Sequence, residues 1–249
     1  MKAMILAAGL GTRLRPLTDT RPKALVPVAG RPMIHWVIAR LVRYGFTEII
    51  INAHHFAAQI ETFAAAYKSP GAPLTVSVEK EILDTGGGVR EAAWFFDREE
   101  PFLVHNVDVL TDLDLRGLAD AHSASGALVT LAVKRRKSSR HLLFDGAGRL
   151  GGWRSDVTGE TRTVRPMAGP VTHLPFMGVY VMSPAVLRKM ADPGPFSIID
   201  FFLDLAGGGG PIQAYRAEDA KWADLGSEDR IEAGVKLFGR DWFERLRCD

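Results

Sequence analysis

The sequence predicts an α/β protein with a doubly wound, mostly parallel, Rossmann-like sheet and a mixed, partly antiparallel second half. Short apolar runs alternate with helical patterns three times in about the first hundred residues, as in parallel sheets that carry helices on both faces. Strand patterns then become denser, and one segment contains the DGAG turn of a hairpin. A chain of 249 residues, 47% of them hydrophobic, can bury a large core.

The first half is expected to supply four strands and the helices between them. We place the strands at residues 2–8, 48–52, 74–78 and 101–105, and the helices at residues 32–45, 57–67 and 88–96. The strands are short apolar runs, whereas the helices repeat apolar residues at helical spacing. Ligands bind outside the carboxyl ends of the strands in such sheets. Residues 9–13 and 106–108, which follow the first and fourth strands, therefore mark the expected site.

The second half is richer in strands and ends in a helix. We expect strands at residues 127–133, 176–182, 212–216 and 222–226, a hairpin at 144–150, a helix from Pro184 and a flexible loop at 206–211. Residues 227–247 have the pattern of one helix, with Ser227 as its N-cap. Since no linker or internal repeat interrupts the chain, we predict a single domain over 1–249. It would comprise the halves 1–125 and 126–226 and a C-terminal helix in 227–249.

Charge and cysteine content exclude several classes of protein. The net charge of +2 gives no reason to expect nucleic acid as a partner. The single cysteine, Cys248, can form no internal disulfide, which fits a reducing compartment. No apolar run reaches the roughly 18 residues of a membrane span, and the N-terminus lacks a signal-peptide pattern. We therefore expect a cytoplasmic protein with no membrane partner.

One dense basic cluster stands out against this even charge. It comprises Lys134-Arg135-Arg136-Lys137 together with Arg140. We expect these residues to form a solvated loop, and a phosphate-facing role is the alternative.

A glycine turn with two cations follows the first strand. Gly9 and Gly11 lack a Cβ, so backbone N–H groups there can approach an anion closely. Arg13 adds a guanidinium suited to phosphate oxygens, and Lys23 adds a second positive charge. The alternative is an ordinary turn with two surface cations. Neither the P-loop nor the GxGxxG motif is present, since Leu14 stands where the third glycine would be.

The longer stretch around this turn resembles a known family. LAAGLGTRLRPLT at residues 6–18, followed by RPKALVPV at 21–28, is similar to the signature of the sugar-1-phosphate nucleotidyltransferases. The resemblance implies that Arg13 grips the leaving pyrophosphate and that Lys23 contacts the region of the α-phosphate, as the two catalytic residues. It implies that a nucleoside triphosphate is held here by Leu6, Ala7, Ala8, Gly9, Gly11, Thr12, Arg13 and Lys23.

Two downstream features are expected to complete the nucleotide site. In Thr85-Gly86-Gly87-Gly88, consecutive glycines would let the backbone approach a flat base, and the N-terminus of the helix that follows would favour an anion. The resemblance places Gly86 and Gly87 against the nucleobase and ribose. Glu79 belongs to the same site, where it could accept hydrogen bonds from a guanine edge or lie behind a uracil.

Two aspartates are candidate ligands for Mg²⁺. Asp108 follows a buried strand in Asn106-Val107-Asp108, and a carboxylate at a strand end suits a hard cation. The family usually has glycine where Val107 stands, which puts the close approach of the backbone to the ligand in question. WADLG at residues 222–226 matches the family's late WxDxG motif, which makes Asp224 the second ligand. Asn106 is expected to contact both the nucleotide and the sugar phosphate.

The sequence indicates fewer residues for the sugar-binding part of the site. FMGVY at residues 176–180 resembles the strand that lines the sugar pocket in the family, where Gly178 would leave room for the sugar ring. The Glu-Lys-Pro element of many members is not visible in this sequence. Glu160, within residues 151–170, is the remaining candidate for a sugar contact.

These motifs together imply the transfer of a nucleotide to a sugar 1-phosphate. The resemblance extends to the compact uridylyltransferases that use UTP and N-acetylmuramate 1-phosphate, and the TGGG segment and single-domain plan support that choice. A mannose-1-phosphate guanylyltransferase that uses GTP is the alternative. A non-catalytic nucleotide-sugar sensor would be expected to lose Arg13, Lys23, Asp108 or Asp224, and all four are present.

Overall fold

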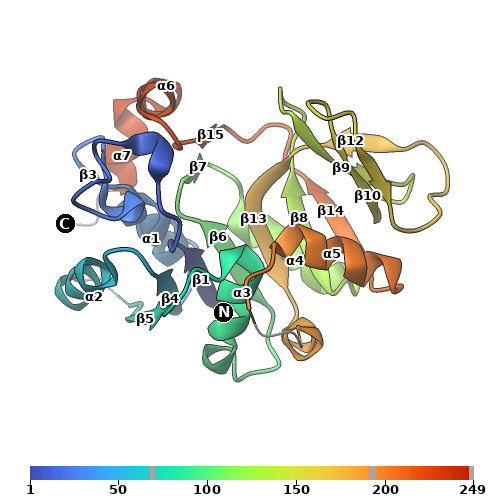
Figure 1. Cartoon of the computed structure of the whole chain (residues 1–249), viewed down its shortest axis with the longest axis horizontal. Coiled ribbons are helices and arrows are strands. Elements are labelled where there is room, and N and C mark those ends of the chain that lie inside the picture. Colours follow the sequence, from blue (N-terminus) through green and yellow to red (C-terminus); the bar gives the residue numbers. More distant parts are fainter. Residues whose placement is uncertain (68–70, 191–193, 247–249) are drawn as a thin grey trace.

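A seven-stranded central sheet organises the molecule, as the sequence predicts (Figure 1). The computed structural model describes residues 1–67, 71–190 and 194–246, so Cys248 lies outside the described residues. The strand order is β14-β8-β13-β6-β1-β4-β5. Within the described residues β13 alone runs antiparallel to its neighbours. The strands are β1 (Lys2–Leu6), β4 (Glu48–Ala53), β5 (Leu74–Val78), β6 (Phe102–Asn106), β8 (Val129–Val133), β13 (Phe176–Met182) and β14 (Ile212–Arg216).

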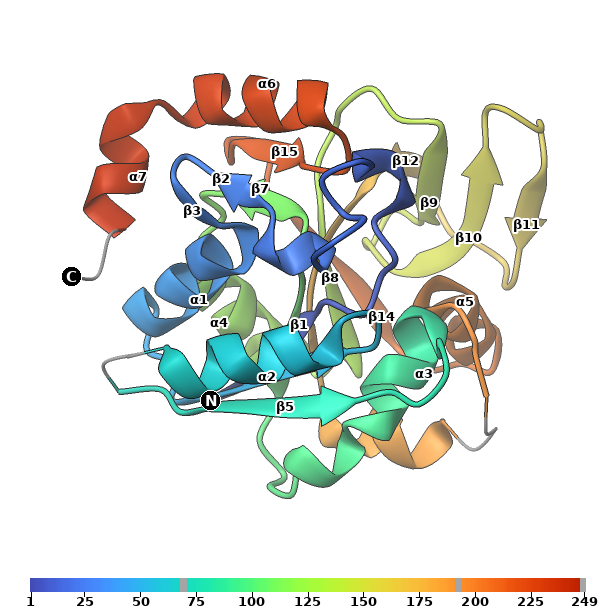
Figure 2. The same ribbon diagram turned by 60° about the vertical axis from the view of Figure 1, so that its left-hand side comes forward.

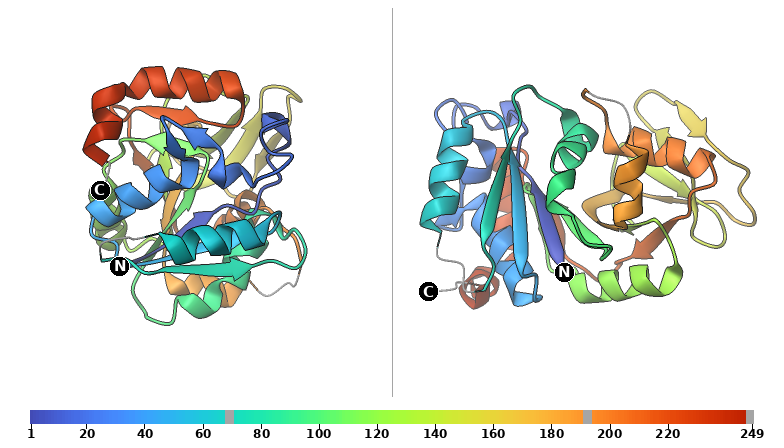
Figure 3. Two further views of the ribbon diagram at one scale, coloured as in Figure 1. Left: turned by 90° about the vertical axis from the view of Figure 1, so that its left-hand side faces the viewer. Right: turned by 90° about the horizontal axis from the view of Figure 1, so that it is seen from below.

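Helices cover both faces of this sheet, because its strands are apolar on both sides (Figure 3). Ala3 and Ile5 of β1 pack on one side, whereas Met4 and Leu6 pack on the other. The first face is covered by α1 (Met33–Arg43), α2 (Ala57–Ala66) and α4 (Leu115–Ser125). The second face is covered by α3 (Asp84–Glu91), α5 (Ile198–Gly207) and the short 3-10 helices η3 (Ala93–Phe95) and η4 (Pro184–Lys189).

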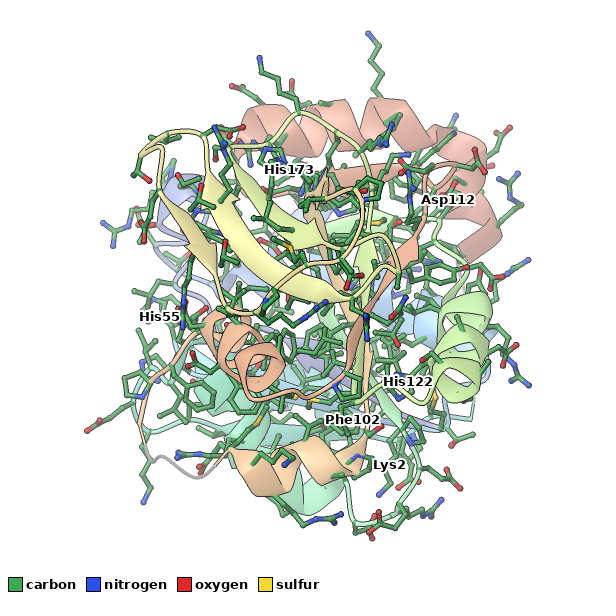
Figure 4. All side chains as sticks on the ribbon, turned by 90° about the vertical axis from the view of Figure 1, so that its right-hand side faces the viewer. Lys2, His55, Phe102, Asp112, His122 and His173 are labelled. Carbon is green, nitrogen blue, oxygen red and sulfur yellow. The ribbon has the colours of Figure 1, made fainter. Side chains whose placement is uncertain are left out.

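A second sheet of four strands packs on the α5 side of the molecule. Its order is β11-β10-β9-β12, with all described pairs antiparallel. The strands are β9 (Arg140–Phe144), β10 (Leu150–Ser155), β11 (Thr161–Thr163) and β12 (Thr172–Leu174). In Figure 4 this sheet and α5 lie in front of the central sheet, with His173 on β12. The predicted hairpin around residues 144–150 is confirmed and forms the centre of this sheet.

A third apolar cluster closes the end of the molecule opposite the small sheet. Leu14, Trp36 and Leu225 pack there with residues of α6 (Glu228–Phe238) and α7 (Arg240–Leu246). The neighbouring strands are β2 (Pro27–Val28), β3 (Arg31–Pro32), β7 (Val109–Thr111) and β15 (Trp222–Asp224), and the 3-10 turns are η1 (Thr12–Leu14) and η2 (Lys23–Leu25). The two pairs β2–β3 and β7–β15 are antiparallel.

Several predicted boundaries were wrong. The single helix over 227–247 is two helices, because Gly239 has φ +74° and ψ 161°, which no helix contains. Ser227 occupies the N-cap position, but its side chain makes no capping hydrogen bond. The helix predicted from Gly88 begins at Asp84, and the predicted loop at 206–211 begins inside α5. Strands β2, β3, β7, β11 and β12, helix α4 and the first part of α5 were not predicted from the sequence.

Among the described residues, no helix has both the length and the apolar character needed to cross a lipid bilayer.

Candidate active site

Two cavities meet at the carboxyl ends of β1 and β6, where the sequence predicts the site. The smaller has a volume of about 360 Å³ and lies between the loop after β1 and the segment 79–85. The larger, of about 660 Å³, extends over the small sheet to α5. Asn106, the last residue of β6, lines both cavities. A ligand that spans the two would therefore pass beside its side chain.

The glycine turn lines the smaller cavity. Gly11 has φ +65°, and a Cβ there would lie 3.0 Å from side-chain atoms of Thr18 and Lys23. Thr18 Oγ1 donates a hydrogen bond to the Gly11 carbonyl oxygen at 2.9 Å, which fixes the turn. A Cβ at Gly9 would meet no atom within 4 Å, so the backbone there is open to the cavity. Leu6, Ala7 and Ala8 line the cavity together with Gly9, whereas Gly11 and exposed Thr12 do not.

Lys23 and Asp108 form an ion pair at the cavity wall. The Lys23 side chain is 10% exposed and that of Asp108 24%, and Lys23 Nζ donates to Asp108 Oδ2. Val107, which stands in place of the usual glycine, is buried, and its N–H donates to the Leu6 carbonyl oxygen at 3.0 Å. Its side chain packs in the core with Ala7. The valine therefore leaves Asp108 at the cavity.

Asp224 lies at the strand end next to Asp108. β15 pairs with β7, and the Leu225 N–H donates to the Asp108 carbonyl oxygen at 2.8 Å. The Asp224 carboxylate accepts hydrogen bonds from the Gly226 N–H at 2.7 Å and from Arg230 at 2.5 Å. The structure thus brings together two aspartates that are separated by 115 residues in the sequence.

Arg13 reaches the same place from the loop after β1. A Cβ at Gly226 would lie 2.5 Å from Arg13 Nη2 and 2.7 Å from Asp224 Oδ1. The guanidinium therefore occupies the space that the missing side chain leaves beside Asp224. Figure 2 shows this loop, in dark blue, running to the start of α6. Lys23 and Asp108 line the smaller cavity and Asp224 lines the larger, while Arg13 lies beside Asp224 without lining either cavity.

The two aspartates fit a divalent cation that is shared with a substrate. Mg²⁺ is held in many proteins by one or two carboxylates together with substrate phosphates. Within residues 1–67, 71–190 and 194–246, no group of three or more His, Cys, Asp or Glu side chains forms a cage for a metal. Asp108, which lines the smaller cavity, and Asp224, which lines the larger, are the carboxylates that could hold a cation of the first kind.

A buried polar network, not predicted from the sequence, holds the wall of the smaller cavity. Asn52 at the end of β4 accepts a hydrogen bond from the Ala7 N–H and donates one to Glu79 Oε1, both at 2.6 Å. Glu79 Oε2 accepts a hydrogen bond from the Leu83 N–H at 3.1 Å. Burial raises the pKa of the Glu79 carboxyl, although these hydrogen bonds oppose the shift. Hydrogen bonds of Asn52 and Glu79 thus connect the loop after β1, the end of β4 and the segment 79–83 around the cavity.

The glycines of the TGGG segment lie inside α3, not before it. A Cβ at Gly86 would lie 2.2 Å from the Phe196 ring, and one at Gly88 would lie 2.6 Å from both Asn52 and Glu79. Gly87 is buried against the Gly194 carbonyl oxygen. The lining of the smaller cavity includes Thr85 and Asp84 but neither Gly86 nor Gly87. The close packing of α3 therefore accounts for the glycines at these positions. We had expected the reason to be a close approach of the backbone to a base.

Gly178 also acts through a neighbouring side chain. Its φ is +77°, and a Cβ there would lie 3.0 Å from Asn106 Nδ2 and 2.9 Å from Val109. The β13 register shifts between Phe176 and Tyr180, around this glycine. The space in front of Gly178 is therefore filled by Asn106 and not left open for a sugar. Glu160, by contrast, lines the larger cavity as expected of a sugar contact.

The basic cluster is only partly a solvated loop. Lys134 donates to the Glu218 carbonyl oxygen, and Arg136 donates to that of Phe176 and stacks on Trp222, with its Cζ 3.8 Å from the ring centroid. Arg136 and Arg140 line the larger cavity. The cavity has further polar residues that were not predicted from the sequence, namely Ser138, His141, Arg162, Ser197 and Asp200.

Comparison with known proteins agrees with this geometry. Residues 2–237 match the family described as Nucleotidyl transferase. The chain is 32% identical to the N-acetylmuramate alpha-1-phosphate uridylyltransferase of Caulobacter vibrioides, over 94% of this chain and 96% of that protein. It is 50% identical to the Neisseria meningitidis protein of the same name, over 46% of this chain and 49% of that protein.

Solved structures share the fold. UDP-glucose pyrophosphorylase from Acinetobacter baumanii superimposes with a TM-score of 0.79 at 19% identity, over 98% of this chain and 96% of that chain. The match over most of the sequence and the joined cavities at the ends of β1 and β6 lead to one conclusion. The chain belongs to the nucleotidyl transferase family, among the sugar-1-phosphate nucleotidyltransferases.

Proposed function

We propose that this protein joins UTP and N-acetylmuramate 1-phosphate to give UDP-N-acetylmuramate and pyrophosphate. The observation that carries the proposal is the pair of cavities that meet at Asn106, with Arg13, Lys23, Asp108 and Asp224 along their edge. The name of the Caulobacter relative, which aligns over nearly the whole chain, supports these substrates. Residues 1–125 would bind the nucleotide, and residues 126–226 the sugar phosphate.

The reaction is an in-line displacement at the α-phosphorus. An oxygen of the sugar phosphate forms a bond to this phosphorus, while the bond to the oxygen that bridges to the β-phosphate breaks and pyrophosphate leaves. The attacking oxygen is already anionic at neutral pH, so no general base is needed. The main barrier is the approach of two anions, and catalysis therefore depends on positioning and on neutralising charge.

The residues at the junction are suited to those tasks. The open backbone at Gly9 can approach phosphate oxygens, and Lys23 lines the same cavity. Arg13 lies over Gly226, where its guanidinium can hold the leaving pyrophosphate. Asp108 and Asp224 would hold Mg²⁺, which would add positive charge beside the phosphate oxygens. Asn106 can donate a hydrogen bond to either substrate.

The hydrogen bonds of Glu79 indicate how its carboxylate meets the base. Guanine recognition by a carboxylate needs free acceptor oxygens that face two N–H groups of the base. Glu79 is 3% exposed, and its two oxygens already accept hydrogen bonds from Asn52 and Leu83. A buried carboxylate with these bonds is suited to lie behind the base, a position that either base allows, so the name of the Caulobacter relative remains the support for UTP.

Pyrophosphate release in the presence of Mg²⁺ tests the proposal. Each nucleoside triphosphate is combined with N-acetylmuramate 1-phosphate and with mannose 1-phosphate. We expect turnover with UTP and the muramate sugar, and Asp108→Asn and Asp224→Asn should each lower the rate by about 10²–10³-fold. Asp120→Asn is the matched control, because Asp120 is exposed on α4 and, among the residues that the structure describes, forms an ion pair with Arg116 alone.

The other outcomes distinguish the alternatives. Turnover confined to GTP and mannose 1-phosphate would identify a guanylyltransferase and leave the phosphate and metal roles intact. A folded protein that binds nucleotide but turns over none of these pairs would support a nucleotide-sugar sensor. Full activity of Asp108→Asn would contradict the metal role of that residue.

A further inference from the structure

The larger cavity holds more cationic groups than one phosphate requires. Three arginines line it, and two of them are already engaged. Arg162 forms ion pairs with Asp200 at 3.2 Å and Asp204 at 2.5 Å. Arg136 stacks on Trp222 and donates a hydrogen bond to the Phe176 carbonyl oxygen. Arg162 is therefore compensated by two carboxylates, whereas half-buried Arg136 is held in place by Trp222 and Phe176 and keeps an Nε that has no hydrogen-bond partner among the described residues.

Arg140 is the third, and its guanidinium is unpaired. It is exposed and begins β9, and only its backbone is held, through two hydrogen bonds with Ser138 Oγ. Within the described residues, its side chain makes no hydrogen bond or ion pair. The protein therefore presents one uncompensated positive charge to the larger cavity from the small sheet.

The small sheet holds this charge apart from the nearest candidate partner on the same wall. Arg140 lies opposite Ser155 in the β9–β10 register, and the Ser155 N–H donates to the Glu160 carbonyl oxygen at 2.9 Å. Residues aligned across neighbouring strands share a face, so Arg140 and Glu160 stand on one face two strands apart, about 9–10 Å between backbones. Both line the cavity without pairing.

We propose that Arg140 binds a carboxylate on the sugar 1-phosphate and so selects a sugar acid over its neutral counterpart. This inference rests on the proposed function, since the phosphate of the sugar must lie at the junction near Asn106 to reach the α-phosphorus. Arg140, on the small sheet, is then left for a second anionic group. N-acetylmuramate carries such a carboxylate on the lactyl ether that N-acetylglucosamine lacks. A guanidinium is well suited to it, because its fork matches a carboxylate geometrically.

A matched pair of substrates tests the inference. N-acetylmuramate 1-phosphate and N-acetylglucosamine 1-phosphate differ in the lactyl group alone. We expect Arg140→Gln to raise KM for the muramate sugar by about 10–100-fold, as expected for the loss of a hydrogen-bonded charge pair. The change in kcat should be small, and the preference for the muramate sugar over its neutral counterpart should fall by the same factor. Arg140→Lys keeps the positive charge but loses the forked geometry, so its KM for the muramate sugar should lie between the values for the wild-type protein and Arg140→Gln.

Arg154 provides the control. It is on the next strand, β10, pairs with Asp156 at 3.2 Å and does not line the cavity, so Arg154→Gln should leave the preference unchanged. An equal loss for both sugars in Arg140→Gln, or no loss for either, would overturn the role of Arg140.

A second pair separates this inference from the proposed function. Glucuronate 1-phosphate and glucose 1-phosphate also differ by a carboxylate. If the muramate sugar is not a substrate but the acid of this pair is preferred through Arg140, the proposed function fails and the inference stands. If the wild-type protein prefers the acid in neither pair, the inference fails.

Discussion

At the residue scale, Gly226 sets the position of Arg13. A side chain at Gly226 would collide with Arg13 Nη2 and Asp224 Oδ1, which are the ends of two side chains that can move away. We therefore expect Gly226→Ala to displace the guanidinium and lower kcat by about 10–100-fold, since small misplacements of catalytic groups are costly. The free energy of unfolding should change little. Steady-state kinetics and urea denaturation measure the two effects, and an unchanged kcat would show that Arg13 does not act from this position.

His105 on β6 should make stability depend on pH. Its Nδ1 lies 2.8 Å from the Asn106 carbonyl oxygen, and burial lowers the pKa of the His105 imidazole to about 4. Between that value and the ordinary 6.5 the unfolded chain binds a proton that the folded protein does not. Stability should therefore fall as the pH drops from 6.5 to 4, by roughly 3 kcal/mol in total from this residue.

Denaturation of the wild-type protein and His105→Asn across this pH range tests the expectation. The difference in unfolding free energy between the two proteins isolates the contribution of His105 from those of the other titrating groups. Parallel curves for the two proteins would show that His105 is not the origin of the pH dependence.

At the scale of elements, Gly239 breaks the C-terminal helix and lets α7 turn back onto α1. The Trp36 and Phe243 rings lie 4.8 Å apart as a result. With φ +74° and ψ 161°, Gly239 is in a region that is essentially restricted to glycine. Gly239→Ala should lower the free energy of unfolding by about 1–3 kcal/mol. Exposed Lys236→Ala on α6 should change it by less than about 0.5 kcal/mol, and equal effects of the two substitutions would contradict this account.

The elements that could be predicted are those whose own residues decide their structure. The strands β1, β4, β6 and β13 are continuous apolar runs, because both of their faces are buried. The start of α3 could not be predicted in this way. Three successive glycines disfavour a helix, and only contacts with Phe196, Asn52 and Glu79 explain why they occur in one.

At the scale of the whole molecule, the joined cavities should couple ligand binding to folding. A ligand that binds the folded state stabilises it by about 2.7 kcal/mol at a hundred times its Kd. We expect UTP with Mg²⁺ to raise the midpoint temperature of thermal unfolding. Asp108→Asn should remove the part of this temperature shift that depends on Mg²⁺. Calorimetric scans with and without EDTA measure both. A shift that is insensitive to EDTA and to Asp108→Asn would contradict a shared cation.

In the candidate site, as in the fold, the features that could be predicted are those encoded in one short stretch of sequence. Gly9, Arg13 and Lys23 lie in one contiguous motif, and Asp224 in a second, so all four could be proposed from the sequence. Asn52 could not, because its bond to Ala7 joins two strand ends 45 residues apart and no motif surrounds it. Arg140 was visible only as part of a basic cluster, and its orientation toward a cavity depends on how β9 pairs with β10.

The small sheet leaves and rejoins the central sheet at adjacent points. Residues 134–175, which contain β9 to β12, begin after β8 and end before β13, its antiparallel partner, and the Lys134 N–H donates to the Pro175 carbonyl oxygen at 3.2 Å. This segment is thus a cassette with its two ends side by side, while Arg13, Lys23, Asp108 and Asp224 all lie outside it. If this cassette selects the sugar as we propose, its exchange for that of another family member should change the sugar that is used and leave the phosphate chemistry unchanged.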